Sequence, residues 1–144
     1  MTTKGLKKKL WKLFRLLIYK RDKGICQSCG ANLRDKTWNA GHLISQGTAG
    51  SYCGETLWVH LLNVWVQCVV CNNSAGGNQI ELNRRVSEKL GFNVYEYLFA
   101  IRRAEQERKR KTMEKWEPKK IQRLIEALEK GENYQEIHKQ VYKL

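Results

Sequence analysis

Two Cys-x-x-Cys pairs have the spacing most typical of a chemical site in this sequence: Cys26 with Cys29, and Cys68 with Cys71. Each pair can span one edge of the tetrahedron around a Zn²⁺ ion, so the four thiolates predict a structural zinc with no open coordination position. The alternative is a redox dithiol, which usually lies in a βαβ pattern that is absent here. An odd number of cysteines fits reduced thiols better than a disulfide framework, and we expect the fifth, Cys53, to be an inert loop thiol.

Three polar residues between or directly after these pairs could carry a reaction. His42 is the candidate general base, because an imidazole titrates near neutral pH. Asn72 can offer its amide oxygen to Mg²⁺, and Asn63 can hold the surrounding loop or the imidazole in place. Taken singly, a histidine is more often a structural hydrogen-bonding residue, and an asparagine at a helix start is often a cap. Together with the cysteine pairs, they favour phosphodiester hydrolysis, which needs a base and a hard cation at the phosphate.

The charge of the chain indicates a polyanionic partner. Its 144 residues carry a formal net charge of +13, which favours binding along a phosphate backbone and gives a small neutral substrate no advantage. Solvated helix faces are also often basic, so the prediction concerns the whole set and not any single lysine. The residues predicted to bind DNA are Lys7, Lys8, Lys9, Lys12, Asn78, Arg84, Arg85, Arg108, Lys109, Arg110 and Lys111.

The N-terminal residues 1–21 predict a basic amphipathic helix, with apolar residues at helical spacing and lysines between them. A membrane-surface helix is an alternative, but it leaves the cysteines unexplained. No apolar run approaches the roughly 18 residues of a transmembrane helix. Lys12 and Arg15 also interrupt the apolar stretch that a signal peptide would need. We therefore expect a cytosolic protein without a membrane partner.

Between the cysteine pairs the sequence is irregular and rich in β-forming residues. Residues 38–44 predict one strand and residues 57–66 its returning partner, joined by a loop rich in Gly, Ser and Thr at residues 47–54. Residues 71–74 predict a helix start, and residues 76–78 predict a turn or a break. Zinc would then hold a cysteine turn against the N-terminus of a helix, which is the arrangement of a treble clef.

After residue 79 the periodicity is helical again. Gly91 predicts a helix end and Asn93 a cap for the next helix, while Pro118 and Gly131 predict the two ends of another. The fold class we predict is α+β, with helices on both sides of a zinc-bound core. The three predicted segments are the basic N-terminal helix at residues 1–21, the zinc-stapled core at residues 22–92 and a basic helical arm at residues 93–144.

The order of these motifs resembles that of the phage NinG (Rap) recombination proteins over most of residues 10–130. It is also similar to the wider ββα-metal nucleases, known as HNH or His-Me finger enzymes, and to phage endonuclease VII. The ordered set is far more specific than any one motif. The resemblance is carried by Trp11-x-x-Phe14, Tyr19-Lys20-Arg21-Asp22, Cys26-x-x-Cys29-Gly30, Asn39-Ala40-Gly41-His42, Asn63, Gln67-Cys68-x-x-Cys71-Asn72 and Gly77-Asn78.

This resemblance implies a treble-clef ββα-metal (HNH-like) core and a structure-specific endonuclease. Such an enzyme cuts branched recombination intermediates, Holliday junctions among them, with Mg²⁺ or Mn²⁺ at the active site, in the phage or host-cell cytosol. By motif matching, His42 takes the general-base position, Asn63 the middle asparagine and Asn72 the metal-ligand position. A homodimer fits an enzyme that must cut two strands. The alternative is a non-catalytic, zinc-stabilised DNA-binding protein that aids recombination.

Two departures from the family pattern concern the activity more than the fold. HNH-type enzymes usually carry an aspartate just before the base, where this chain has Gly41. NinG relatives tend to have an Arg-Phe pair after the loop, where this chain has Trp58-Val59. The second protein ligand of a catalytic metal must then come from elsewhere. The candidates from the sequence are Asn39, Glu55 and His60.

Overall fold

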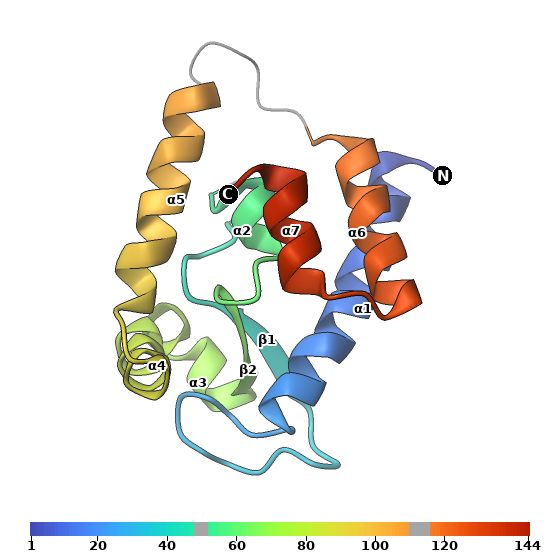
Figure 1. Cartoon of the computed structure of the whole chain (residues 1–144). Helices are drawn as coiled ribbons and strands as arrows, with labels where there is room; N and C mark the ends of the chain where they lie inside the picture. The colour runs from blue at the N-terminus through green and yellow to red at the C-terminus, as the bar shows by residue number, and fades with distance from the viewer. Residues whose placement is uncertain (48–51, 110–115) are drawn as a thin grey trace.

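A computed structural model describes residues 1–47, 52–109 and 116–144 of the chain. In these residues helices surround a small antiparallel sheet, so the predicted α+β class is confirmed (Figure 1). No helix among them is both long enough and apolar enough to cross a bilayer. The elements in chain order are α1 (Thr3–Asp22), β1 (Trp38–His42), α2 (Gly54–Trp58), β2 (Val64–Cys68), α3 (Val69–Asn73), α4 (Ala75–Leu90), α5 (Val94–Lys109), α6 (Pro118–Lys130) and α7 (Tyr134–Tyr142).

The first helix forms as its sequence predicts. Thr2 caps the N-terminus, because its side chain accepts a hydrogen bond from the N–H of Gly5 at 3.1 Å. One stripe of α1 is buried against the rest of the chain, and the lysines lie between and opposite the buried positions. The buried apolar residues of this stripe are Leu6, Leu10, Phe14 and Ile18.

The sheet consists of β1 and β2 in antiparallel register, with Trp38 opposite Cys68 and His42 opposite Val64. α3 follows β2 without a linker, since Cys68 is both the last residue of the strand and the N-cap of the helix. The returning strand predicted at residues 57–66 is wrong over residues 57–63, because the short helix α2 ends at Trp58 and β2 begins only at Val64. Residues 57–60 are all buried, so this stretch had no alternation that could distinguish strand from helix.

The helix boundaries that depend on local chemistry are confirmed. Gly91 and Gly131 both end helices in the left-handed conformation, and Pro118 lies in the first turn of α6. Asn93 caps α5 by accepting the N–H of Glu96 at 3.1 Å. The break predicted at residues 76–78 lies earlier, at Ser74, which is extended between α3 and α4. Its hydroxyl donates to the carbonyl of Val70 at 2.7 Å, a bond that competes with the helix ladder.

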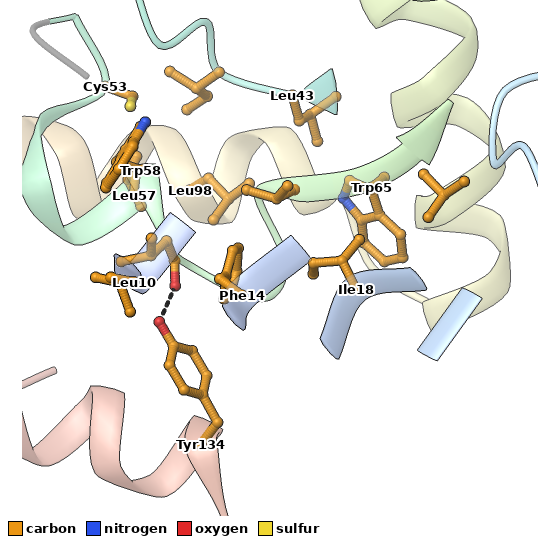
Figure 2. Close-up of a cluster of buried hydrophobic side chains, with 14 of the residues drawn as sticks. Leu10, Phe14, Ile18, Leu43, Cys53, Leu57, Trp58, Trp65, Leu98 and Tyr134 are labelled. Carbon is orange, nitrogen blue, oxygen red and sulfur yellow. Dashed lines mark hydrogen bonds between the residues drawn. The ribbon is translucent and has the colours of Figure 1, made fainter. Parts of the chain in front are cut away.

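One hydrophobic core joins the N-terminal and C-terminal helices. α6 packs against α1, α7 packs against α6, and α5 packs against α2 (Figure 1). Figure 2 shows Leu10, Phe14 and Ile18 of α1 in a row facing the side chains of the hairpin and of α2. Tyr134 of α7 donates its hydroxyl to the carbonyl of Val59 at 2.6 Å. The C-terminal helices α6 and α7 thus fold back on the core.

Candidate active site on a cysteine-stapled hairpin

The four paired cysteines come together in space. The Sγ atoms of Cys26, Cys29, Cys68 and Cys71 all lie within 4.8 Å of one another. The Sγ atoms of Cys29 and Cys68 are 3.9 Å apart, which is close to the roughly 3.8 Å edge of a tetrahedron with Zn–S bonds of about 2.3 Å. This cluster, here called the cysteine cage, could therefore hold a zinc ion, as the sequence spacing predicts.

A tight turn provides the first half of the cage. Gly30 has a φ of 81°, a left-handed conformation that suits glycine, and its N–H donates to the carbonyl of Cys26 at 2.8 Å. The N–H of Cys26 donates in return to the carbonyl of Ala31 at 2.9 Å. Ile25 and Asn32 close the turn with an isolated antiparallel bridge. Local backbone bonds thus fix the positions of Cys26 and Cys29.

The start of α3 provides the second half. The side chain of Cys68, at the N-cap, accepts the N–H of Cys71 at 3.4 Å. A helix N-terminus favours a negative charge, so it stabilises thiolates at this end of α3. The cage therefore joins the tight turn to the point where β2 becomes α3.

The crowded thiols do not ionise alike. Burial raises the pKa of Cys71, and hydrogen bonds among the neighbouring thiols raise it further. Burial also raises the pKa of Cys29. Burial acts in the same direction on Cys26, but N–H groups of Cys68, Cys29 and Ser28 outweigh it and lower the pKa to about 7. A metal ion entering the cage would displace the remaining thiol protons.

His42, at the end of β1, is held as a neutral imidazole. Its Nε2 lies 3.0 Å from the carbonyl oxygen of Trp58, and a carbonyl can only accept, so Nε2 carries the proton. Burial lowers the pKa of His42 to about 4, although the Trp58 carbonyl acts in the opposite direction. The ring of Trp11 stacks on the imidazole, with centroids 5.3 Å apart and planes 10° apart. The lone pair of Nδ1 lies in the ring plane, and no described group forms a hydrogen bond with it.

Asn63 braces the loop behind His42. Its side chain is fully buried, and Oδ1 accepts the N–H of Ile44 at 2.7 Å. Its Nδ2 donates to the carbonyls of Leu57 at 2.9 Å and Ile44 at 3.2 Å. These bonds tie the end of β1 to the end of α2, which also supplies the carbonyl that holds His42. Asn63 thus has a positioning geometry, and it is too buried to touch a substrate.

Asn72 lies on α3, next to the cage and partly exposed. α3 packs against both strands, so Asn72 and His42 belong to the same hairpin-and-helix unit. Within the described part of the chain, its side chain forms no hydrogen bond, which leaves the amide oxygen open to a ligand. The three predicted site residues therefore lie on or beside one hairpin.

Gln67 is a residue of this site that had no role assigned from the sequence, although it begins the motif Gln67-Cys68-x-x-Cys71-Asn72. It is buried on β2 opposite Asn39, and its Nε2 donates to the hydroxyl of Ser28 at 2.7 Å. A Cβ added to Gly41 would overlap the side-chain amide of Gln67. The glycine before His42 therefore has a steric cause, since an aspartate there would collide with Gln67. Its place in that motif was the signal for Gln67 in the sequence.

Two of the three sequence candidates for a second metal ligand are engaged elsewhere. Glu55 accepts the Tyr142 hydroxyl at 2.8 Å and the Glu117 N–H at 3.3 Å, and burial raises its pKa. His60 is buried, and its Nδ1 accepts the N–H of Leu62 at 3.0 Å. Asn39, partly exposed on β1 on the same face as Gly41, is the remaining candidate.

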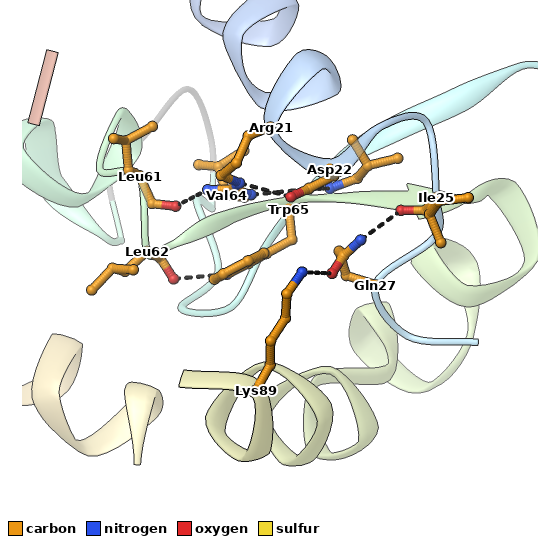
Figure 3. Close-up of polar contacts among 10 residues, drawn as sticks. Arg21, Asp22, Ile25, Gln27, Leu61, Leu62, Val64, Trp65 and Lys89 are labelled. Atoms are coloured by element: carbon orange, nitrogen blue, oxygen red, sulfur yellow. Dashed lines mark hydrogen bonds and ion pairs between the residues drawn. The ribbon is translucent and has the colours of Figure 1, made fainter. Parts of the chain in front are cut away.

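The C-terminal end of α1 holds the hairpin in place (Figure 3). The Arg21 guanidinium pairs with the buried Asp22 carboxylate at 2.7 Å and donates to the carbonyls of Leu61 and Val64. The other oxygen of Asp22 accepts the N–H of Val66 on β2 at 2.9 Å. These bonds satisfy backbone groups that the short sheet leaves unpaired.

The residues predicted to bind DNA fall into separate surface regions. Lys8 and Lys12 are exposed on α1, Lys9 pairs with Glu129 at 3.4 Å, and Lys7 lies 3.7 Å from the centroid of the Trp116 ring. Arg84 and Arg85 line a hollow beside the cysteine turn, together with Arg21, Lys23 and Lys89. Asn78 lies near the start of α4, the helix that carries Arg84 and Arg85, and has a φ of 52°. Arg108 and Lys109 end α5, while Arg110 and Lys111 lie outside the described residues.

Comparison with known protein families gives one match. A family model described as the bacteriophage Lambda NinG protein matches residues 2–132. The matched range contains α1, both strands, the whole cysteine cage and all three predicted site residues. No curated protein and no solved structure matches the chain.

Proposed function

The chain belongs to the NinG family of bacteriophage lambda, and from this membership and the geometry of the hairpin we propose that it is a metal-dependent, structure-specific DNA endonuclease. Its substrates would be branched recombination intermediates such as junctions. The proposed core is a treble-clef ββα-metal unit of HNH type, with structural zinc in the cysteine cage. Cutting both strands of a junction requires two active centres, so we expect two copies of the chain on DNA.

The single observation that carries this proposal is the state of His42. A general base must be unprotonated at neutral pH and must present a free lone pair. The bond from Nε2 to the Trp58 carbonyl leaves Nδ1 as the basic nitrogen of the imidazole. The order of elements supports the same assignment, because a strand ending in histidine, a second strand and a helix starting in the cage follow one another.

In the proposed reaction, Nδ1 of His42 takes a proton from the water that attacks the phosphorus. Asn63 keeps the imidazole and its carbonyl partner aligned through the bonds to Ile44 and Leu57. Asn72 would hold Mg²⁺ or Mn²⁺, and Asn39 is the remaining candidate for a second ligand. A divalent cation at this position supplies neutralisation of charge on the phosphate and on the leaving oxygen.

Cleavage of branched DNA by His42→Ala tests the proposal. We expect the rate on flapped or four-way DNA with Mg²⁺ or Mn²⁺ to fall about 10²- to 10⁴-fold, because the proton acceptor is lost. Binding to the same DNA should persist. Asn72→Ala should also abolish cleavage, whereas its exposed neighbour Asn73→Ala on the same helix serves as the matched control.

A non-catalytic, zinc-stabilised DNA-binding protein is the second candidate. Gly41 favours this alternative, because a glycine cannot supply the acidic metal ligand that is usual at this position. The side-chain amide of Gln67 occupies the space that such a ligand would need. Absence of cleavage by the unmodified protein on flapped, branched and duplex DNA, with either metal and with intact binding, would establish this alternative.

A further inference from the structure

Two hollows lie on either side of Trp11 along the exposed face of α1. The first, of about 640 Å³, lies between Trp11 and Trp38. The second, of about 440 Å³, lies between Trp11, Trp58 and Trp116. Lys8 and Trp11 line both hollows. The two hollows are treated as one surface, here called the α1 groove.

The α1 groove combines an aromatic floor with a cationic rim. Its described lining holds lysines and an arginine but no acidic residue. Trp11 is only partly buried, and its ring stacks on both His42 and Trp58, with the Trp58 centroid at 5.0 Å and the planes 18° apart. The two hollows adjoin the part of Trp11 that remains exposed.

This combination fits an unpaired nucleotide better than a duplex. A free base can stack on an indole ring while its phosphate meets a lysine or arginine at the rim. Bases in a duplex are stacked on one another and present only their edges and the outer phosphates. A duplex would therefore use the cations of the groove and leave its indole rings to the side chains that already contact them, such as Arg15 at 4.5 Å from the Trp38 centroid.

The α1 groove also lies beside the candidate base. Trp11 contacts the His42 ring on one face and lines both hollows. A strand lying along the groove would pass over Trp11, whose ring stacks on His42. Trp38, on the same strand face as His42, extends the aromatic floor towards the other end of β1.

We propose that the α1 groove binds single-stranded DNA, with unpaired bases stacked on Trp11 and Trp38 and phosphates at Lys8, Lys12 and Arg15. The proposal rests on the proposed function in taking DNA as the polymer. It deepens that function by assigning the unpaired segment at a branch, rather than a duplex arm, to the surface next to His42.

Fluorescence anisotropy without added divalent metal tests this proposal independently of cleavage. The probes are one labelled oligonucleotide as a single strand and the same sequence as a blunt duplex. Trp38→Leu and Trp11→Leu should each weaken single-strand binding by about five-fold or more and duplex binding by less than two-fold. Trp38 does not contact His42, so its variant keeps the test valid if Trp11→Leu unfolds.

Two further variants separate stacking from charge. Phe99→Leu removes an exposed aromatic ring from α5, on the other side of the molecule from α1 in Figure 1, and should change neither affinity. Lys12→Gln should weaken both DNA forms alike and reduce the slope of log affinity against log salt by about 0.7 to 0.9.

Equal losses for both DNA forms, or no loss, in the tryptophan variants would overturn the proposal. So would sedimentation showing that Trp38→Leu separates a dimer while single-strand affinity is unchanged, because a second copy would then occupy the α1 groove. A protein that prefers single strands through these tryptophans but cuts no DNA would refute the nuclease and leave the groove assignment intact.

Discussion

Gln67 and Gly41 show how a single contact shapes the candidate site. The two residues lie on opposite strands, and the amide of Gln67 fills the space above Gly41 while it donates to Ser28 in the cysteine turn. One side chain therefore links the cage, β2 and β1. It also excludes from the position before His42 every residue that carries a Cβ, unless Gln67 moves.

A double-mutant cycle tests this steric coupling. Gly41→Ala alone should lower the free energy of unfolding by about 1 to 3 kcal/mol, because the added methyl group overpacks a buried site. In a Gln67→Ala background the same change should cost at least about 1 kcal/mol less. Urea unfolding followed by circular dichroism measures all four proteins. Strictly additive losses would show that the two residues do not compete for the same space.

His60 and His138 form a pair of buried histidines outside the hairpin. Their rings are buried with centroids 4.9 Å apart. Burial lowers the pKa of His60 to about 3, with the neighbouring His138 acting in the same direction. Burial also lowers the pKa of His138 to about 4, against the effect of the Thr56 carbonyl 2.8 Å from its Nε2. Both rings are therefore neutral in the folded protein.

The free energy of unfolding should decrease as the pH is lowered from about 6.5 to about 4. The unfolded chain takes up protons on both histidines below the ordinary pKa of 6.5, whereas the folded chain does so only near 3 to 4. Each histidine then contributes a slope approaching about 1.4 kcal/mol per pH unit, or roughly 3 kcal/mol for the pair from pH 7 to 5. Urea midpoints at the two pH values measure the loss. Burial also lowers the pKa of His42 to about 4, so His42 adds a similar slope and His138→Gln should remove about a third of the total loss. A stability that is flat over this range would contradict the burial of these rings.

At the scale of elements, the cysteine cage joins pieces that are too short to be stable alone. The turn at residues 25–32 has one isolated bridge, the sheet has two strands, and α3 spans only Val69–Asn73. An isolated two-stranded hairpin is marginal in water, and a one-turn helix does not persist without packing. We therefore expect a metal ion in the cage to order the hairpin and the start of α3 together.

Cys29→Ser tests the cage with little loss of packing, because Cys29 is exposed. We expect the unmodified protein to contain one zinc per chain and the variant to contain none. Unfolding free energy should fall by roughly 3 kcal/mol or more, since structural zinc binding is worth on the order of 10 kcal/mol. The control is Cys53→Ala, which removes a buried cysteine outside the cage and should keep its zinc. Elemental analysis measures the zinc content of both variants, and thermal melting measures their stability. Zinc retained in Cys29→Ser would contradict a four-thiolate site.

At the scale of the whole molecule, positive charge surrounds the hairpin on more than one side. The α1 groove and the hollow beside Arg84 and Arg85 both carry an excess of cations. α1 and α4 lie on different sides of the sheet in Figure 1, so a branched DNA could contact both at once. The formal net charge of +13 is consistent with such a wide contact area.

The salt dependence of binding measures that contact area. With six to ten phosphates neutralised, affinity for a four-way junction should fall about 10³- to 10⁵-fold between 50 and 200 mM salt. A short duplex that reaches only one cationic region should show a smaller slope. Anisotropy titrations of both DNAs over this range give the two slopes. Equal slopes would mean that a single region makes all the phosphate contacts.

The sequence alone determined the features of this protein that depend on neighbouring residues. The cysteine spacing predicted the cage, because two cysteines with two residues between them can bind the same metal ion. The apolar stripe of α1 and the glycines at positions 91 and 131 predicted helices and their ends, since periodicity and left-handed caps act within a few residues. His42, Asn63 and Asn72 also stood out by their order relative to the cysteines.

Only the tertiary structure decided which side chains meet across the chain. The Trp58 carbonyl fixes the tautomer of His42, Gln67 accounts for Gly41, and Trp11 of α1 covers the imidazole. α2 also replaced part of a predicted strand, because burial on every side removed the alternation that marks a half-buried strand. Each of these contacts joins residues well separated in sequence, and composition and spacing do not encode how such segments pack.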